Sequence, residues 1–171
     1  MRTYEGASRQ NYEAVLRSLG AVLDQRGMRE ITVNESDDGF IVQGLALAPG
    51  EQRDWSDPEA RIDKETFHLR DEDMSRFMDE AQTRRQGRQQ GQAAAPGAGA
   101  ADSGFYELAL RVVGAYVDQQ EPRDVFFFEQ DHQFVMRLLM PTRAGLHHVL
   151  VEFTKDEIEA MIAAGQQGRG R

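Results

Sequence analysis

Residues 12–45 read YEAVLRSLGAVLDQRGMREITVNESDDGFIVQGL, and residues 106–139 read YELALRVVGAYVDQQEPRDVFFFEQDHQFVMRLL. The two stretches align without a gap at an offset of 94 positions and share 13 identical residues over 34. The identities include the pairs Tyr12 and Tyr106, Gly20 and Gly114, Asp24 and Asp118, and Glu35 and Glu129. A repeat of this length indicates two copies of one structural unit.

The first copy begins with a helical pattern. Its apolar positions are spaced for one helix face, and they are Tyr12, Val15, Leu16, Leu19, Val22 and Leu23. Gly27 follows where a left-handed residue ends many helices. Residues 31–34 and 40–43 alternate as strands, and Asp37-Asp38-Gly39 between them is typical of a hairpin turn. Residues 66–69 predict a third strand, and residues 71–81 a closing helix.

The second copy follows the same plan. A helix is predicted over 104–120 and strands over 125–129, 134–140 and 146–153, with a turn at 141–145. Thr154 and Glu157 form a capping-box pattern in front of a last helix. The fold class expected is α+β, a tandem duplication of an α-β-β-β-α unit. Each unit has a three-stranded antiparallel sheet with helices on one face, and a pseudo-twofold axis relates the two units. The sequence leaves open whether the sheets join edge to edge or face each other.

These elements predict four segments. Residues 1–82 form the first repeat, with a charged insertion at 50–64 that contains Trp55. Residues 83–103 are rich in Gln, Gly, Ala and Arg and are expected to be a flexible linker. Residues 104–165 form the second repeat, and residues 166–171 are a flexible tail.

The second copy carries more apolar surface than one helix layer covers. In residues 125–128 both faces of the strand are apolar, so Phe126 and Phe128 must point away from the face that Val125 and Phe127 share. Leu108 and Val112 lie off the main face of their helix. This surface could be covered by the first copy, by a second molecule of the same chain or by another protein. Phe126, Phe128, Leu108, Val112 and, in the insertion, Trp55 are therefore the candidate partner-binding residues.

Gly20 and Gly114 recur in the middle of the two long helices. Glycine within a helix costs about 1 kcal/mol relative to alanine. A cost that both copies accept indicates close packing, of the two helices against each other or of each helix against its sheet.

Composition limits the classes of function. The 171 residues carry a net charge of −9, which disfavours a nucleic-acid or membrane interface, and the absence of cysteine excludes thiolate chemistry and disulfides. We see no signal peptide and no apolar run long enough to span a membrane, so the expected location is the cytoplasm. Arg84, Arg85 and Arg88 make the linker locally basic and are the candidates for contact with RNA, although no aromatic residue lies among them to stack bases.

No reactive constellation is recognisable. The four histidines (His68, His132, His147 and His148) do not form a metal-binding pattern, and neighbouring His147 and His148 point to opposite faces of a strand. The acidic residues of the insertion (Asp54, Asp57, Glu59 and Asp63) lack the spacing of a calcium loop. Glu35 and Asp37 match Glu129 and Asp131, as duplication and turn preference predict without catalysis. We expect no cofactor and no metal.

The order helix, three strands, helix resembles that of small chaperone-like domains that bind partner proteins. The leading hypothesis is a non-enzymatic intracellular adaptor or chaperone-like module that binds a protein, or a second copy of itself, through the apolar surface of the second repeat. The alternative is a small-molecule-binding or catalytic domain with a pocket between the repeats, near Trp55 and the matched turns.

Overall fold

The computed structural model describes residues 12–70, 73, 76, 79, 83, 104–131 and 133–167. The elements in chain order are α1 (Tyr12–Arg26), β1 (Arg29–Ser36), β2 (Gly39–Leu47), β3 (Ile62–Arg70), α3 (Phe105–Gln120), β4 (Asp124–Gln130), β5 (Gln133–Thr142), β6 (Gly145–Thr154) and α4 (Lys155–Gln167). The fold is α+β, with an α-β-β-β half followed by an α-β-β-β-α half. In the predicted helix at 71–81, residues 73, 76 and 79 are helical, and the rest of it lies outside the described residues.

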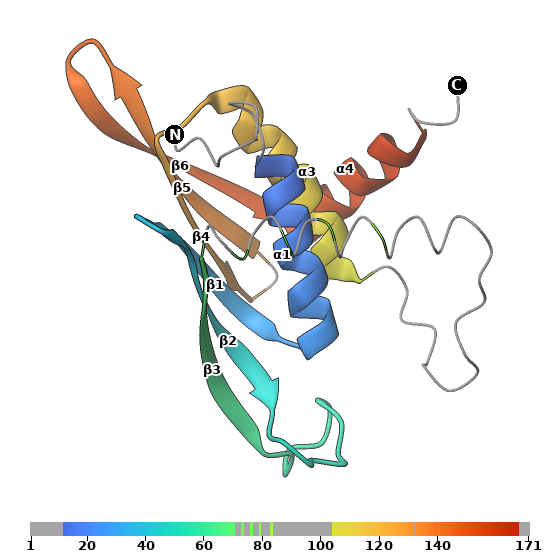
Figure 1. Cartoon of the computed structure of the whole chain (residues 1–171). Coiled ribbons are helices and arrows are strands. Elements are labelled where there is room, and N and C mark those ends of the chain that lie inside the picture. Colours follow the sequence, from blue (N-terminus) through green and yellow to red (C-terminus); the bar gives the residue numbers. More distant parts are fainter. Residues whose placement is uncertain are drawn as a thin grey trace.

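The six strands form one continuous antiparallel sheet in the order β3-β2-β1-β4-β5-β6 (Figure 1). The halves join where β1 pairs with β4, through Thr32 with Phe128, Val33 with Phe127 and Asn34 with Phe126. Of the two arrangements that the sequence leaves open, the structure has the edge-to-edge one, so the two three-stranded sheets form one six-stranded sheet. Edge-to-edge pairing satisfies the backbone groups that each isolated sheet would have left open at its first strand.

Helices α1 and α3 lie side by side on one face of this sheet (Figure 1). The apolar stripes of both helices meet the inward-facing residues of the central strands. The largest fully buried side chains belong to both halves, and they are Phe40, Phe127, Leu16, Leu19, Leu23, Met28, Ile31, Leu110, Met136, Leu138 and Ile158. One core thus serves the whole described chain.

The two repeated glycines lie where α1 and α3 touch. A Cβ atom added to Gly20 would be 2.2 Å from the carbonyl oxygen of Tyr106, and one added to Gly114 would be 2.5 Å from that of Tyr12. Since no real Cβ atom approaches a backbone oxygen so closely, only glycine allows this helix spacing. The contacts are reciprocal, because the middle of each helix meets the first turn of the other.

Each long helix also caps the other. The Asp24 carboxylate, near the end of α1, accepts hydrogen bonds from the amides of Tyr106 (3.1 Å) and Glu107 (2.8 Å) at the start of α3. Asp118, near the end of α3, accepts from the amides of Tyr12 (2.9 Å) and Glu13 (3.0 Å) at the start of α1. These amides have no partner within their own helix.

A second reciprocal pair ties the helices to the sheet. The Tyr12 hydroxyl donates to Glu35 of β1 at 2.7 Å, and the Tyr106 hydroxyl donates to Glu129 of β4 at 2.5 Å. Burial raises the pKa of Tyr106, and the adjacent Glu129 carboxylate raises it further. The matched glutamates therefore have a structural partner in each half.

β3 and β5 extend into segments that the sequence pattern assigns to an insertion and to a turn. β3 begins at Ile62, inside the predicted insertion, because Ile62, Asp63 and Lys64 pair with the last residues of β2. β5 continues through Pro141, which pairs with Leu146, so the turn is shorter than predicted. Proline lacks a donor but is tolerated near the end of a strand. In both places the backbone pairing continues past the residues that show a clear alternation of apolar and polar side chains.

The last helix starts as its sequence predicts. Thr154 Oγ1 accepts from the Glu157 amide at 3.2 Å, and Glu157 Oε2 accepts from the Thr154 amide at 2.8 Å, which confirms the capping box. Ile158 is fully buried, and Met161 and Ile162 pack against the core. Helix α4 thus extends the helix layer beyond α3. No helix of the described part of the chain is long and apolar enough to cross a membrane.

Candidate interaction surface

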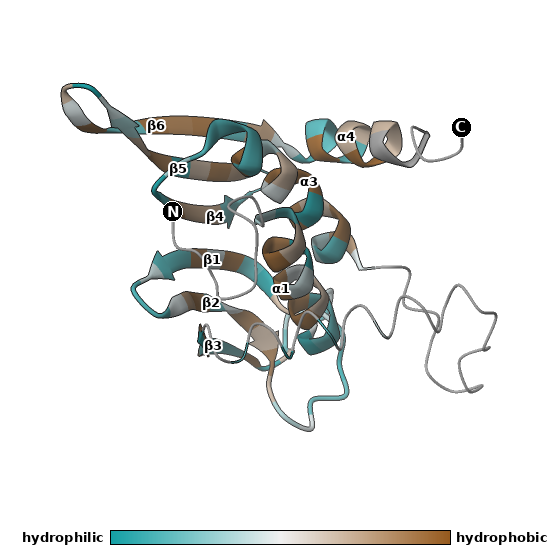
Figure 2. Ribbon diagram, turned by 45° about the horizontal axis from the view of Figure 1, so that its top comes forward, coloured by the Kyte–Doolittle hydropathy of each residue, from teal (hydrophilic) through white to brown (hydrophobic). Residues whose placement is uncertain are grey.

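The sheet has a second face, opposite to the face that α1 and α3 cover (Figure 2). We call it the open face. On β4 the alternation of burial assigns the side chains: Val125 and Phe127 are buried in the core, whereas Phe126 and Phe128 are half-buried on the open face. The aromatic side chains therefore lie on the side of the sheet away from the helix layer.

Strand register builds two rows of side chains across the open face. One row runs Asn34, Phe126, Arg137, Leu150, and the other runs Thr32, Phe128, Val135, Glu152. Directly opposite residues in an antiparallel ladder share a face and lie in contact. The phenylalanines of both rows belong to the second half of the chain, and the first row continues into the first half through Ile41, which pairs with Asn34.

The aromatic rings on this face are close together and partly shielded. The ring centroids of Phe126 and Phe128 are 5.9 Å apart, and the guanidinium of Arg137 lies 5.1 Å from the Phe126 centroid. Arginine over an aromatic face is a favourable contact. Farther out on β6, Leu146 is 48% exposed and Leu150 is 63% exposed. The open face thus carries exposed apolar side chains as far as the edge strand β6.

The first half lacks the phenylalanines of this surface. At the positions that correspond to Phe126 and Phe128 it carries Thr32 and Asn34, and in place of Arg137 it carries Gln43. Since both halves keep the same fold in the sheet, the difference lies in the side chains alone. The phenylalanines of the open face belong to the second half, whereas both halves place aliphatic residues on it, Ile41 and Leu45 in the first and Val135 and Leu139 in the second.

Leu108 and Val112 belong to a different surface. Both lie on α3, in the helix layer, so the sheet separates them from Phe126 and Phe128. Val112 is only 8% exposed and helps to line a cleft of about 410 Å³ whose other residues are Glu13, Arg111, Ala115, Tyr116, Gln119, Met161 and Ala164. The candidate partner-binding residues therefore do not form one continuous patch.

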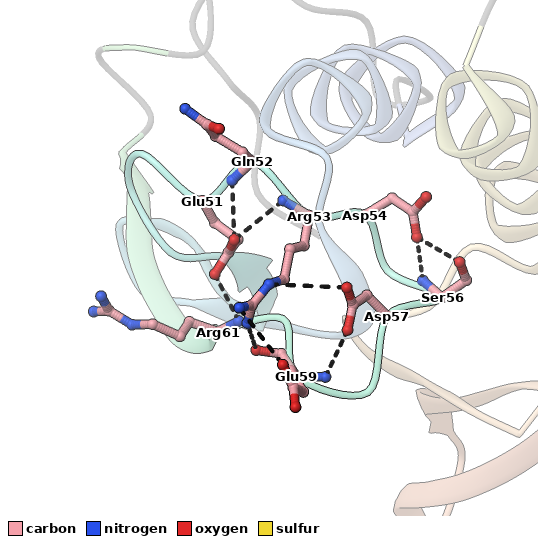
Figure 3. A network of polar contacts seen from close by, with 8 residues as sticks. All are labelled: Glu51, Gln52, Arg53, Asp54, Ser56, Asp57, Glu59 and Arg61. Atoms are coloured by element: carbon pink, nitrogen blue, oxygen red, sulfur yellow. Dashed lines mark hydrogen bonds and ion pairs between the residues drawn. The ribbon is translucent and has the colours of Figure 1, made fainter.

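Trp55 also lies apart from the open-face aromatics. The Arg29 guanidinium stacks 4.7 Å from its ring centroid, which attaches the loop between β2 and β3 to the start of β1. Figure 3 shows how the loop's own polar groups organise it. Glu51 Oε1 accepts from the amide of Arg53, and Glu51 Oε2 accepts from the amide of Arg61. The acidic side chains of this loop thus bind loop amides and Arg53, and they serve its conformation.

A smaller cleft lies at the joint between the halves. Its volume is about 200 Å³, and its lining residues are Asn34, Glu35, Ser36, Asp37, Asp124, Val125, Phe126, Arg137, Leu139 and His148. The Glu35 carboxylate is held there by the Tyr12 hydroxyl and by the Val125 amide, at 3.0 Å. Burial raises the pKa of Glu35, against the effect of these two hydrogen bonds. Trp55 is not part of this cleft.

Metal ligands do not gather in the described part of the chain. It contains no cluster of three or more His, Asp or Glu side chains suited to a metal ion. His68 contacts Asp38 at 3.2 Å, whereas His147 and His148 are exposed on β6. His132, Arg84, Arg85 and Arg88 lie outside the described residues, as does most of the predicted linker.

Asp24 and Asp118 are the important residues that the sequence analysis did not single out. The signal was available, because both are identical in the repeat and both lie in the last turn of a helix. A carboxylate is unfavourable at the end of its own helix. An acid repeated at that position points to a partner outside the helix.

Comparison of the chain with protein-family models, with curated proteins and with solved structures finds no match. A fold by itself hosts many functions. The functional argument therefore rests on the open face and on the two clefts.

Proposed function

We propose that this chain is a non-enzymatic protein-interaction module, of adaptor or chaperone-like type, and that it binds a partner protein on the open face of its second half. The observation that carries the proposal is the position of Phe126 and Phe128. They lie side by side on the open face, in rows that continue across β5 to β6. Aromatic residues with arginine at their border are typical of protein interfaces.

We also infer that the chain is a tandem duplication with an approximate twofold axis through the joint. The pairing supports this, because Val33 and Phe127, which correspond in the repeat, are paired with each other. The reciprocal glycine contacts and aspartate caps obey the same relation. Duplication frees one copy to keep the framework while the other acquires an apolar face.

Charge indicates the chemistry of the partner. The chain carries a net charge of −9, and complementary charge favours and accelerates association. We therefore propose a partner segment with apolar side chains for Phe126 and Phe128 and with basic residues at its borders. Raised salt should then weaken binding mainly by slowing association.

The test compares three forms of the full chain in affinity capture from the native host at moderate salt, with mass spectrometry. The forms are the natural sequence, the double variant Phe126→Ser with Phe128→Ser, and the control Thr32→Ser with Asn34→Ser on the same face of the first half. We expect one stoichiometric protein to be retained by the natural sequence and by the control and to be lost by the double variant. Circular dichroism must show that the double variant is folded. Equal capture by all three forms would contradict the proposal.

The second candidate function is small-molecule binding in the cleft at the joint. Its support is the convergence of Glu35, Asp37, Asp124, Arg137 and His148 from both halves. The cleft has about 200 Å³, below the roughly 300–1,000 Å³ of typical ligand sites, so we rank it second. A thermal-shift screen with metabolites tests it, because a bound ligand raises the melting temperature.

A further inference from the structure

The two edges of the sheet differ in how they are protected. β3 and β6 are the outermost strands, and Figure 2 shows no described element that pairs with the outer side of β6. β3 carries the charged residues Asp63, Lys64, Glu65 and Arg70. Charged side chains on an edge strand oppose pairing with another chain. The charged side chains of β3 therefore oppose pairing of this edge with a strand of another chain.

β6 has no such protection over most of its length. From Leu146 to Val151 it contains no Asp, Glu, Lys or Arg, and the strand is 10 residues long. Leu146 and Leu150 are the two most exposed large apolar side chains of the described residues. A long apolar edge with free backbone donors and acceptors favours the addition of another strand.

We propose that β6 pairs antiparallel with β6 of a second copy of this chain, centred on Leu150. The two six-stranded sheets then form one twelve-stranded sheet with a twofold axis at the Leu150 pair. Keeping both helix layers on the same side requires that residues of the same face stand opposite each other. When the twofold axis passes through a pair of identical residues, every residue stands opposite a residue of the same face. When the axis passes between two residues, every residue stands opposite one of the other face.

The register centred on Leu150 is self-complementary. On the open face, Leu150 stands opposite the partner's Leu150, and His148 opposite the partner's Glu152. On the other face, Val149 stands opposite the partner's Val151. Apolar pairs and pairs of a histidine with a carboxylate stabilise neighbouring strands, whereas like charges directly opposite destabilise them. A shift of two residues, centring on His148, would lose the contact between His148 and the partner's Glu152.

The chain already contains one joint of this kind. β1 and β4 pair antiparallel about Val33 and Phe127, with α1 and α3 on the same side of the sheet. The β6 joint would repeat this geometry between molecules. It would also bring the open faces of two second halves onto the same side of one sheet. The inference thus goes beyond the proposed function and does not depend on it.

Charge reversal tests the register by analytical ultracentrifugation of the purified full chain over a concentration series. We expect a dimer for the natural sequence. His148→Glu places two carboxylates opposite each other twice, and we expect at least a tenfold rise in the dissociation constant. Adding Glu152→Lys restores opposite charges, and the double variant should regain the dimer. Thr66→Glu, the same charge on the edge strand β3, should leave the dimer unchanged.

Cysteine cross-linking supplies an independent measurement, since the chain has no cysteine of its own. Opposite residues of an antiparallel pair have Cα atoms about 4.5–5.5 Å apart, within the range of a disulfide. Leu150→Cys should therefore form an intermolecular disulfide on mild oxidation. Val149→Cys, which faces the partner's Val151, and Ile62→Cys on β3 should form much less.

Three results would overturn the inference. One is a natural chain that sediments as a monomer at every concentration. Another is a folded double charge variant that stays monomeric while Leu150→Cys fails to cross-link. The third is His148→Glu with an unchanged dissociation constant. These measurements use no partner protein, so their failure is separate from failure of the capture experiment on Phe126 and Phe128.

Discussion

Gly20 and Gly114 carry the closest approach between α1 and α3. Helix propensity alone predicts that Gly20→Ala stabilises the chain by about 1 kcal/mol. The contact predicts the opposite, because the added methyl would be 2.2 Å from a carbonyl oxygen of the facing helix. We expect Gly20→Ala and Gly114→Ala each to lower the free energy of unfolding by about 1–3 kcal/mol in urea titrations. Gln119→Ala, exposed on α3, is the control, and a stabilised Gly20→Ala would show that the helices are farther apart.

Glu35 makes stability depend on pH. Its pKa is raised by burial above the ordinary value of 4.5, so the folded chain holds this proton more tightly than the unfolded chain. The contribution of Glu35 to the free energy of unfolding should therefore fall as pH rises from about 4.5 through the raised pKa, and then level off. Glu35→Gln keeps an acceptor for Tyr12 and Val125 but does not titrate. We expect this variant to gain stability relative to the natural chain as pH rises, as urea unfolding at several pH values can measure.

A control for that pH series is Glu159→Gln, which removes an exposed carboxylate of α4. It should show no comparable trend relative to the natural chain. If the natural chain instead gained stability over Glu35→Gln with rising pH, the pKa of Glu35 would be lowered in the fold. The role assigned to its burial would then be incorrect.

At the scale of elements, each long helix depends on an aspartate of the other. Asp118→Ala removes the acceptor of the first two amides of α1, although the substitution is in α3. Loss of a cap costs about 0.5–2 kcal/mol. We expect faster hydrogen exchange in the first turn of α1 in this variant, and in the first turn of α3 in Asp24→Ala. Faster exchange confined to the substituted helix would contradict capping between the helices.

At the scale of the whole molecule, the halves share one core and one sheet. The joint combines the β1–β4 ladder, the helix contact at the glycines and the exchanged caps. We expect residues 1–82 and residues 103–171, expressed separately, to lack a cooperative thermal transition. Mixing the two should restore one, as circular dichroism can show. A cooperative transition in either half alone would mean that the mutual interface is not required for folding.

Much of this architecture can be predicted from the amino-acid sequence. The helical spacing from Tyr12 to Leu23, the turn at Asp37, the capping box at Thr154 and the repeat itself predict the described elements, because these signals are local. The two-sided apolar pattern around Phe126 also predicts a side chain that the helix layer does not cover. The repeat of side-chain direction along a helix or a strand is enough to assign a residue to one face of its own element.

Only the tertiary structure decides what lies against each face. The joint of β1 with β4 depends on backbone groups that every strand possesses, so no side-chain pattern specifies it in advance. The caps by Asp24 and Asp118 require two helices aligned antiparallel at the glycine spacing. Leu108 and Val112 lie on the opposite side of the sheet from Phe126 and Phe128. The sequence shows only that each pair points away from the main apolar face of its own element. Such relations join residues far apart in the chain, and they exist only once the chain has packed into one core.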